Sequence, residues 1–554
     1  MDTKLSNFSF LWKVLYSIII FISPILGASI YSIDDAHTIT LNTRHPNSHL
    51  HVYIPSLPYG YIMRLINGTL VRLDESAKGW DYYIAYKHEK LDSLTYDFWL
   101  RDDVKFQDGT PLDADIVVYN FTKFIQGAFT FTDIHHKLKS VEKIDKYHIR
   151  IHLNEPYGLL MSDLTRINLY TKKYYEKHSW SNSIIGENTL GTGTYGAGPY
   201  ILVQGHATGL SQSDTVVLKA NPYYFEKGKP YIQTLTIHTR MPIHDVINGL
   251  ANNEGKIDIA FIPLNKKTEI VNSTYAKLSV IPSTTTLNFQ MNLMNPSSPL
   301  HNKKIRQALN QALNQENLIK FAYKGEGIIS PFAISSNVTS AKAISQEMTS
   351  YPPSKMSQEE LKYTLQGLTL NIVTQDRFLD ICRGVEYQLN QYGVHFTYDL
   401  TSDEKYVFQK LLTNRISPHS WDLLLWGNVD WAKHPWSALF TLYTPNQWCA
   451  IKNDEVLDEY MRKLFTLDKD DEHFTPLIET ILRHINEEAY TLNLPSPNTL
   501  LGMNKEVDAT PSSVAILKLW EAKITANHWS VRGENRLPSE RLQYRIPTRI
   551  NFHE

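Results

Sequence analysis

Few residues that could carry out chemistry stand in a spacing that supports catalysis or metal binding. Residues 191–196 match the GxGxxG loop of dinucleotide-binding proteins, but that loop must open a helix. Pro199 and an apolar run follow here, which favours a strand. His135 and His136 are adjacent, and neighbouring side chains seldom point the same way, which favours exposed imidazoles over a metal site. The sequence predicts no catalytic residue, no cofactor and no metal centre, and therefore no enzyme.

The chain has two cysteines, Cys382 and Cys449, and no CxxC pair. If the chain is exported, the two could form one disulfide. Two separate buried thiols are the alternative, and the sequence does not choose between them.

Composition places the chain among soluble globular proteins. It has 554 residues, 42% of them apolar and 20% charged, with a formal net charge of -2. A chain of this length exceeds one ordinary core, so we expect two or three lobes. The near-neutral charge argues against non-specific binding of nucleic acid.

The N-terminus has the composition of a secretory signal peptide. Lys4 and Lys13 precede the apolar run 14–26, and the small residues 27–29 follow it. We therefore expect residues 1–29 to be removed on export. An uncleaved membrane anchor is the less favoured alternative, because a spanning helix needs roughly 20 apolar residues.

Strand-type and helix-type runs alternate after this segment, as in an α/β protein. Expected strands are 37–43, 94–101, 145–153, 216–264 in three pieces, 285–293, 369–375 and 394–400. Expected helices are 113–124, 241–253, 305–323, 378–392, 455–466 and 474–490, with a polar break at 333–358. The last 29 residues, 526–554, are polar and indicate an extension.

Residues 85–109 carry a more specific pattern, in which "LTYDFWLRDDVKFQDG" follows Ala85 and Asp92. This pattern resembles family 5 of the bacterial extracytoplasmic solute-binding proteins, the oligopeptide-, dipeptide- and nickel-binding proteins of ABC importers. Further segments resemble the family in the family's own order: 110–115, 196–200, 221–230, 255–260 and 288–309.

The resemblance implies a periplasmic binding protein-like α/β fold (type II, cluster C), with two hinged lobes and an extra inserted domain. Residues 30–65, 190–285 and 505–525 would form lobe I, 66–189 the inserted domain, 286–504 lobe II, and 526–554 the polar tail.

The resemblance also implies a ligand site in the second lobe. Asp430 matches the family's aspartate that pairs with the α-amino group of a peptide, and Trp431 matches the aromatic residue after it. Trp426 lies in the same matching stretch. His434 stands where the family has an acid, so the match is imperfect, and Asp430 could instead cap the helix that follows.

Other walls of the site are predicted by position only. Tyr59 and Tyr61 match the rim of the first lobe, with core packing as the alternative, and Phe131 lies where the inserted domain approaches the cleft in relatives. The candidates for pairing with a ligand carboxylate are Arg377, Arg383 and Arg415.

The expected function is that of a monomeric periplasmic substrate-binding protein that captures short peptides between closing lobes and delivers them to the transmembrane permease of an ABC importer. A nickel chelate, haem or another small solute is an alternative ligand, because fold does not fix ligand. A secreted, chaperone-like peptide holdase is the alternative from another class.

Overall fold

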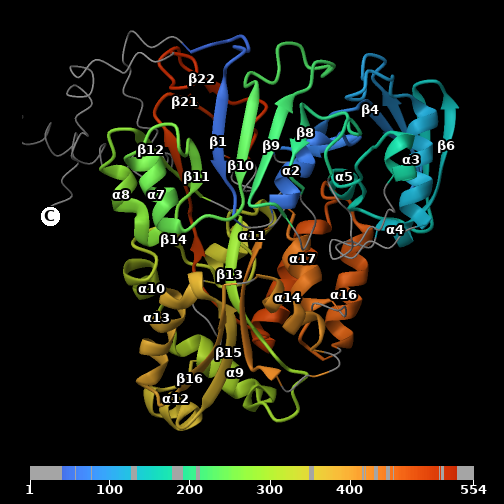
Figure 1. The fold of residues 1–554 in the computed structure, drawn as a ribbon. Coiled ribbons are helices and arrows are strands. Elements are labelled where there is room, and N and C mark those ends of the chain that lie inside the picture. The colour runs from blue at the N-terminus through green and yellow to red at the C-terminus, as the bar shows by residue number, and fades with distance from the viewer. Residues whose placement is uncertain are drawn as a thin grey trace, which may run out of the picture.

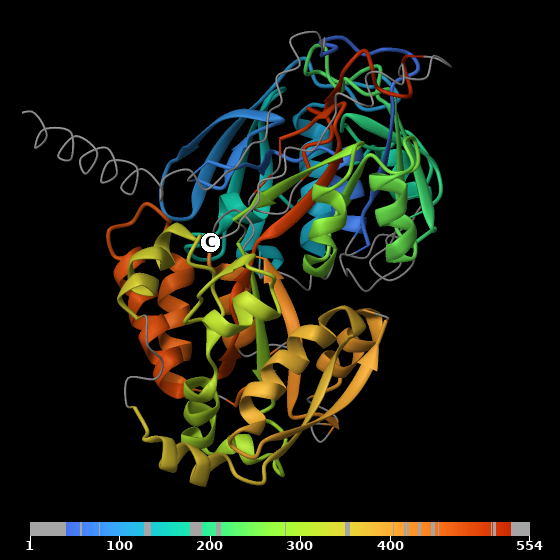
Figure 2. The same ribbon diagram turned by 90° about the vertical axis from the view of Figure 1, so that its left-hand side faces the viewer.

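The computed structural model describes residues 40–55, 58–76, 78–126, 134–177, 191–206, 212–282, 284–348, 355–402, 404–414, 417, 420–429, 434–444, 449–452, 454–510, 512 and 517–532. Figures 1 and 2 show an upper part and a lower part. The upper part is built from the N-terminal half of the chain (blue to green) and its C-terminal segment (red), and the lower part is yellow and orange.

A seven-stranded mixed sheet forms the centre of the upper part, in the order β12-β20-β11-β1-β10-β9-β8. Its strands are β1 (His49–Tyr53), β8 (Tyr200–Gln204), β9 (Thr215–Ala220), β10 (Thr234–His238), β11 (Ile259–Phe261), β12 (Ala276–Ile281) and β20 (Thr499–Asn504). Leu50 and Val52 point from β1 into a fully buried core, while His49 and His51 take the other face. The helices beside this sheet are α2 (Pro58–Ile66), α7 (Ile243–Ala251) and α8 (Lys267–Val271).

The expected strand 37–43 begins outside the described residues, and Thr40 forms only an isolated bridge with Thr525. The expected strands in 216–264 and the helix at 241–253 are confirmed.

A four-stranded antiparallel sheet at the side of the upper part has the order β4-β5-β7-β6. Its strands are β4 (Ala85–Lys90), β5 (Thr95–Leu100), β6 (Leu138–Asp145) and β7 (His148–Leu153), and α3 (Ala114–Gln126) covers one face. The strands predicted at 94–101 and 145–153 are confirmed. Asp113 begins α3 by accepting a hydrogen bond from the backbone of Ile116. The smaller elements are β2 (Val71–Leu73), β3 (Trp80–Tyr82), α4 (Ile134–Lys137), α5 (Leu160–Leu164) and α6 (Lys172–Lys177).

The glycine-rich segment at 191–196 leads into a strand, β8, as predicted. A side chain could not replace the glycines that follow, because a Cβ at Gly196 would lie 2.0 Å from the carbonyl oxygen of Ile66. These glycines allow the loop to lie against the end of α2; they are not a phosphate cradle.

A five-stranded sheet forms the centre of the lower part, in the order β16-β15-β17-β13-β18. Its strands are β13 (Thr285–Met291), β15 (Thr369–Gln375), β16 (His395–Thr401), β17 (Leu423–Val429) and β18 (Thr491–Asn493). The predicted β-α-β unit is confirmed, with α13 (Leu379–Asn390) between two parallel strands.

Helices cover both faces of this sheet. They are α9 (Lys303–Ala312), α10 (Gln315–Phe321), α11 (Thr339–Glu347), α12 (Gln358–Leu365), α14 (Glu404–Leu412), α15 (Trp436–Tyr443), α16 (Glu455–Thr466) and α17 (Phe474–Glu488). The single helix expected at 305–323 is wrong. Leu313 is extended, and the side chain of Asn314 caps a new helix by accepting from the backbone of Asn317.

Cys382 and Cys449 are both buried free thiols in the core of the lower part, so the two-thiol alternative holds. Burial raises the pKa of the Cys382 thiol to about 12. No helix among the described residues is long and apolar enough to cross a membrane.

The beginning of the polar tail is packed, in contrast to the expected extension. His528 is fully buried and Trp529 donates a hydrogen bond to Asp258 at 2.8 Å. Arg532 forms an ion pair with Glu254. Residues 533–554 and the predicted signal peptide, 1–29, lie outside the described residues.

Candidate ligand-binding site

In both large sheets the carboxyl ends of the parallel strands point toward the region between the upper and lower parts, which we call the junction. In the upper sheet β1 runs parallel to β10 and β11, and β11 and β12 are both antiparallel to β20. The end of β12 leads within a few residues into β13 of the lower sheet, so this carboxyl edge faces the lower part. In open α/β sheets ligands bind outside the carboxyl ends of the strands.

The lower sheet presents the same kind of edge. Thr285, which starts β13, pairs with Val429, which ends β17. Because β15 and β16 run parallel to β17, their last residues, Gln375 and Thr401, lie at that edge as well. The two edges therefore face each other, as the walls of a ligand site between lobes must.

Two chain crossovers join the lobes. One runs from β12 to β13, and the other from β18 to β20, where Thr499 pairs with Ile281. The short strands β14 (Gly327–Ile328) and β19 (Ser496–Pro497) pair beside the second crossover. Lys267 of the upper part forms an ion pair with Glu326 at this place. Paired crossovers of this kind form a hinge.

The inserted four-stranded region contacts the lower lobe away from the crossovers. The backbone N–H of Gly158 donates to the carbonyl oxygen of Phe465 at 2.9 Å, and Lys90 pairs with Asp468 at 2.5 Å. A Cβ on Gly158 would lie 1.7 Å from the carbonyl oxygen of Leu467. The two surfaces therefore touch through backbone.

The upper wall carries tyrosine and arginine side chains on and beside α2. Tyr61 packs near Phe261 of β11, with ring centroids 6.1 Å apart, and burial raises its pKa to about 12. Burial lowers the pKa of Arg64 to about 10, with Arg166 as a further repulsive charge. Burial also lowers the pKa of Arg166. Residues about 100 apart in sequence thus place two cations together. The side chain of Tyr59 lies outside the described residues.

The lower wall follows β17. Trp426 is half-buried on this strand, opposite Asn288. Asp430 and Trp431 come directly after the last residue of β17 but lie outside the described residues, as does Phe131. Arg377 follows β15 and is exposed, and its charge reaches Tyr53, the last residue of β1. This electrostatic influence acts across the junction between the lobes. Arg383 is exposed on α13, and Arg415 is outside the described residues.

His434 lies in the interior of the lower lobe. It is 3% exposed and its ring centroid is 5.1 Å from that of Phe474. Burial, followed by the charge of Lys469, lowers its pKa to about 3, so its imidazole is neutral. Among the described residues no cluster of three histidine, cysteine or acidic side chains could hold a metal ion.

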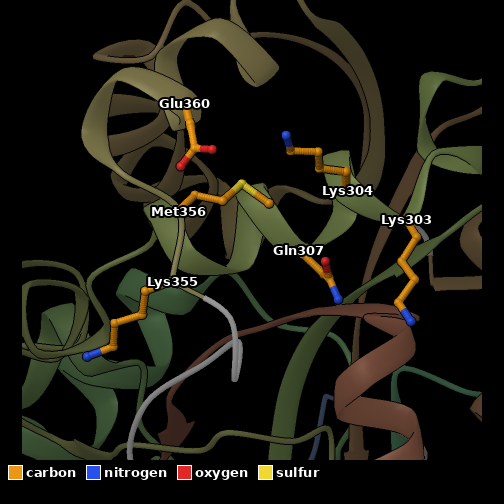
Figure 3. A pocket seen from close by; sticks show the side chains of 6 residues that line it. All are labelled: Lys303, Lys304, Gln307, Lys355, Met356 and Glu360. Carbon is orange, nitrogen blue, oxygen red and sulfur yellow. The ribbon is translucent and has the colours of Figure 1, made fainter.

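A pocket of about 460 Å³ lies elsewhere, at the N-terminal ends of α9 and α12 (Figure 3). Its lining residues are Lys303, Lys304, Gln307, Lys355, Met356 and Glu360. Glu360 closes the capping box of α12 with Ser357, and Lys303 pairs with Glu488. The start of α9 follows the far end of β13, so this pocket is remote from the junction.

The fold is that of the periplasmic binding proteins, mixed α/β with two sheets joined at a hinge. Residues 75–449 match the family described as "Bacterial extracellular solute-binding proteins, family 5 Middle", and the chain belongs to this family.

Curated relatives include the glutathione-binding protein GsiB of Shigella flexneri serotype 5b, 27% identical over 270 residues, which cover 48% of this chain and 49% of that protein. GsiB of Escherichia coli strain K12 is 27% identical over 240 residues, 42% of this chain and 43% of that protein. The matches thus span less than half the length of these relatives.

Solved structures show the same fold. NikA of Staphylococcus aureus, in complex with Ni(L-His)2, has a TM-score of 0.70 and 16% identity, covering 86% of this chain and 100% of that one. AppA of Bacillus subtilis, in complex with a nonapeptide, has a TM-score of 0.70 and 19% identity, covering 87% and 100%. DppA of Helicobacter pylori, in complex with the peptide STSA, has a TM-score of 0.70 and 16% identity, covering 86% and 98%.

Proposed function

We propose that this protein captures short peptides between its two lobes and delivers them to the permease of an ABC importer. The facing carboxyl edges of the two sheets carry this proposal, because they give a ligand two walls on opposite sides of a hinge. The lobe boundaries proposed from the sequence accompany it: lobe I from 30–65, 190–285 and 505–525, the inserted domain from 66–189, and lobe II from 286–504. One correction applies, because β20 at 499–504 pairs with β11 and β12 of the upper sheet and therefore belongs to lobe I.

The charges near the junction favour a ligand with both an amine and a carboxylate. Arg64 and Arg166, two cations on and beside α2, are the proposed partners of a ligand carboxylate, with Asp163 already opposing the charge of Arg166. Asp430 follows β17 in the chain and supplies an acid for the ammonium end. A peptide held between them would also offer its backbone as an added strand, which tolerates many side chains.

The glutathione, peptide and nickel–histidine ligands in the names of similar proteins are the nearest alternatives. Glutathione is itself a tripeptide with free carboxylates, and the same arginine pair would accommodate it. The chelate alternative gains no support from His434, because its side chain is buried against Phe474.

Isothermal titration calorimetry on one preparation tests the proposal. The ligands are di-, tri- and tetra-alanine, glutathione and nickel–histidine. Binding of peptides at micromolar Kd or better supports the proposal. Tight binding of nickel–histidine alone would overturn it. Native mass spectrometry of protein from its own periplasm gives an independent answer, because a co-purified ligand is weighed directly.

The location in the cell belongs to the same proposal. The lysines and apolar run of residues 1–29 support export to the periplasm. N-terminal sequencing should find mature protein beginning near Ser29 or Ile30. An intact Met1 on membrane-bound protein would instead establish an anchor.

A further inference from the structure

Four polar side chains alternate along β13 and the residue directly after it, and all four are buried. Thr286, Asn288, Gln290 and Asn292 are 1%, 0%, 3% and 0% exposed. The outer two have partners: Thr286 donates to the carbonyl oxygen of Ala333 at 3.1 Å, and Asn292 exchanges side-chain hydrogen bonds with Asn414.

The middle two side chains differ. Both the oxygen and the nitrogen of the Asn288 and Gln290 carboxamides are buried without a hydrogen-bond partner. A buried polar group without a partner destabilises the folded state, and native proteins contain few of them. Two on one face of one strand therefore indicate a requirement other than stability.

Their neighbours form a row that reaches the junction. Across the sheet Asn288 pairs with Trp426 and Gln290 with Leu424 of β17, so these side chains share one face. Val373 pairs with Leu424 from β15, which places Gln375, two residues on, in the row of Asn288 and Trp426. The side-chain oxygen of Gln375 is also buried without a partner. Gln375 ends β15, at the carboxyl edge that faces the upper lobe.

We propose that Asn288, Gln290 and Gln375 form a polar subsite for one side chain of the ligand, with Trp426 as its apolar wall. Each carboxamide offers a donor and an acceptor, so the matching group is uncharged and carries both: a carboxamide or a hydroxyl. Val373, Leu424 and Trp426 bear no charge. Asp399, which lies opposite Val373 on β16, is already held by Lys410 and Tyr406, so the subsite disfavours a charged side chain. This subsite rests on the proposed peptide-binding function and adds a specificity to it.

The stability of the ligand-free protein gives the first test and needs no ligand. Asn288→Leu and Gln290→Met replace the carboxamides by apolar side chains of similar shape, and Asn292→Leu is the matched control on the same face. Tm should be unchanged or higher for the first two variants, since they remove buried groups that have no partners. It should fall for the control, which leaves Asn414 without its partner. A fall for Asn288→Leu and Gln290→Met as large as that for the control would show that the carboxamides are structural, and would overturn the subsite.

Peptide affinity gives the second test. The probes are trialanine and three tripeptides in which one Gln replaces the first, second or third alanine. We expect one Gln peptide to bind wild type more tightly than trialanine does. The double variant Asn288→Leu/Gln290→Met should lose that preference, by about 10- to 100-fold in Kd, while binding trialanine as before.

The outcomes separate the subsite from the function on which it rests. If wild type binds trialanine and every Gln peptide equally, the peptide function stands and the subsite fails, and buried water is then the partner of these carboxamides. If wild type binds none of the peptides, the peptide function fails, and the thermal comparison still decides whether the two carboxamides are structural. Equal loss of trialanine and Gln-peptide binding in the double variant would also overturn the subsite.

Discussion

Asp430 is next in sequence after Val429, the last residue of β17, and Asp430→Asn separates its two predicted roles. The lost charged hydrogen bond to a peptide ammonium costs about 1.5–3 kcal/mol, or roughly 10- to 150-fold in affinity. A capping role would survive, because Asn and Asp cap helices about equally well. Calorimetry with free and N-acetylated trialanine on both proteins gives the coupling. Equal binding of free trialanine by wild type and variant would place the anchor elsewhere.

Some residues of the candidate site could not be predicted from the sequence. Arg64 and Arg166 are about 100 residues apart and meet only because α2 packs against the segment after α5, so no local spacing could reveal the pair. The unpartnered carboxamides of β13 were equally hidden, since the lack of a partner is a property of packing. His434 was a ligand candidate because of its place in the matching stretch of the sequence, and only the fold shows its burial.

Among the elements, β1 and β10 carry a column of imidazoles on the outer face of the upper sheet. The rings of His49 and His51 stack at 4.5 Å, and those of His51 and His238 at 5.3 Å. Burial, followed by the charge of His49, lowers the pKa of His51 to about 4, while the carboxylate of Asp258 opposes this shift.

This column predicts a loss of stability in acid. A histidine with a depressed folded-state pKa binds fewer protons folded than unfolded, so the free energy of unfolding is highest above pH 6.5 and falls as pH drops toward 4. In His51→Gln the free energy of unfolding should fall by about 1–2 kcal/mol less between pH 7 and pH 4 than in wild type. This value is discounted for the partial exposure of His51. Urea denaturation of both proteins between pH 7 and pH 4 measures it. Identical pH profiles for the two would contradict the prediction.

The contact between the inserted region and α16 predicts the effect of one methyl group. Gly158→Ala places a Cβ 1.7 Å from the carbonyl oxygen of Leu467, so the two surfaces must separate. We predict that this contact is kept in the ligand-bound protein, so peptide affinity should fall by about tenfold or more, the equivalent of roughly 1.4 kcal/mol. Gly384→Ala is the control, because its Cβ meets the end of the flexible Leu318 side chain at 3.2 Å. Unchanged affinity in Gly158→Ala would show that this contact plays no part in closure.

The expected and observed elements differ where local chemistry overrides periodicity. The helix predicted at 455–466 matches α16, because Asp454 caps it in the expected way. The pattern at 305–323 continues through Leu313, but the polar side chain of Asn314 ends one helix and starts the next. All of β6 except its last residue, Asp145, was missed, because its burial pattern exposes most of its residues and leaves little alternation to detect.

For the whole molecule, the hinge predicts a change of shape. The lobes are joined by the crossovers between β12 and β13 and between β18 and β20, which allows rigid-body closure. Small-angle X-ray scattering should give a smaller radius of gyration when a tight peptide is added. An unchanged radius with saturating, demonstrably bound peptide would count against closure.

The position of β20 also determines the order in which the chain can fold. This strand comes late in the sequence, yet it lies between β11 and β12 inside the upper sheet. The lower sheet is complete once β18 has been made, so the second lobe can fold while the first still lacks an internal strand. A fragment that ends before Thr499 should therefore keep a protease-resistant lower lobe and a protease-sensitive upper one. The lobe that begins the chain is the last to be finished.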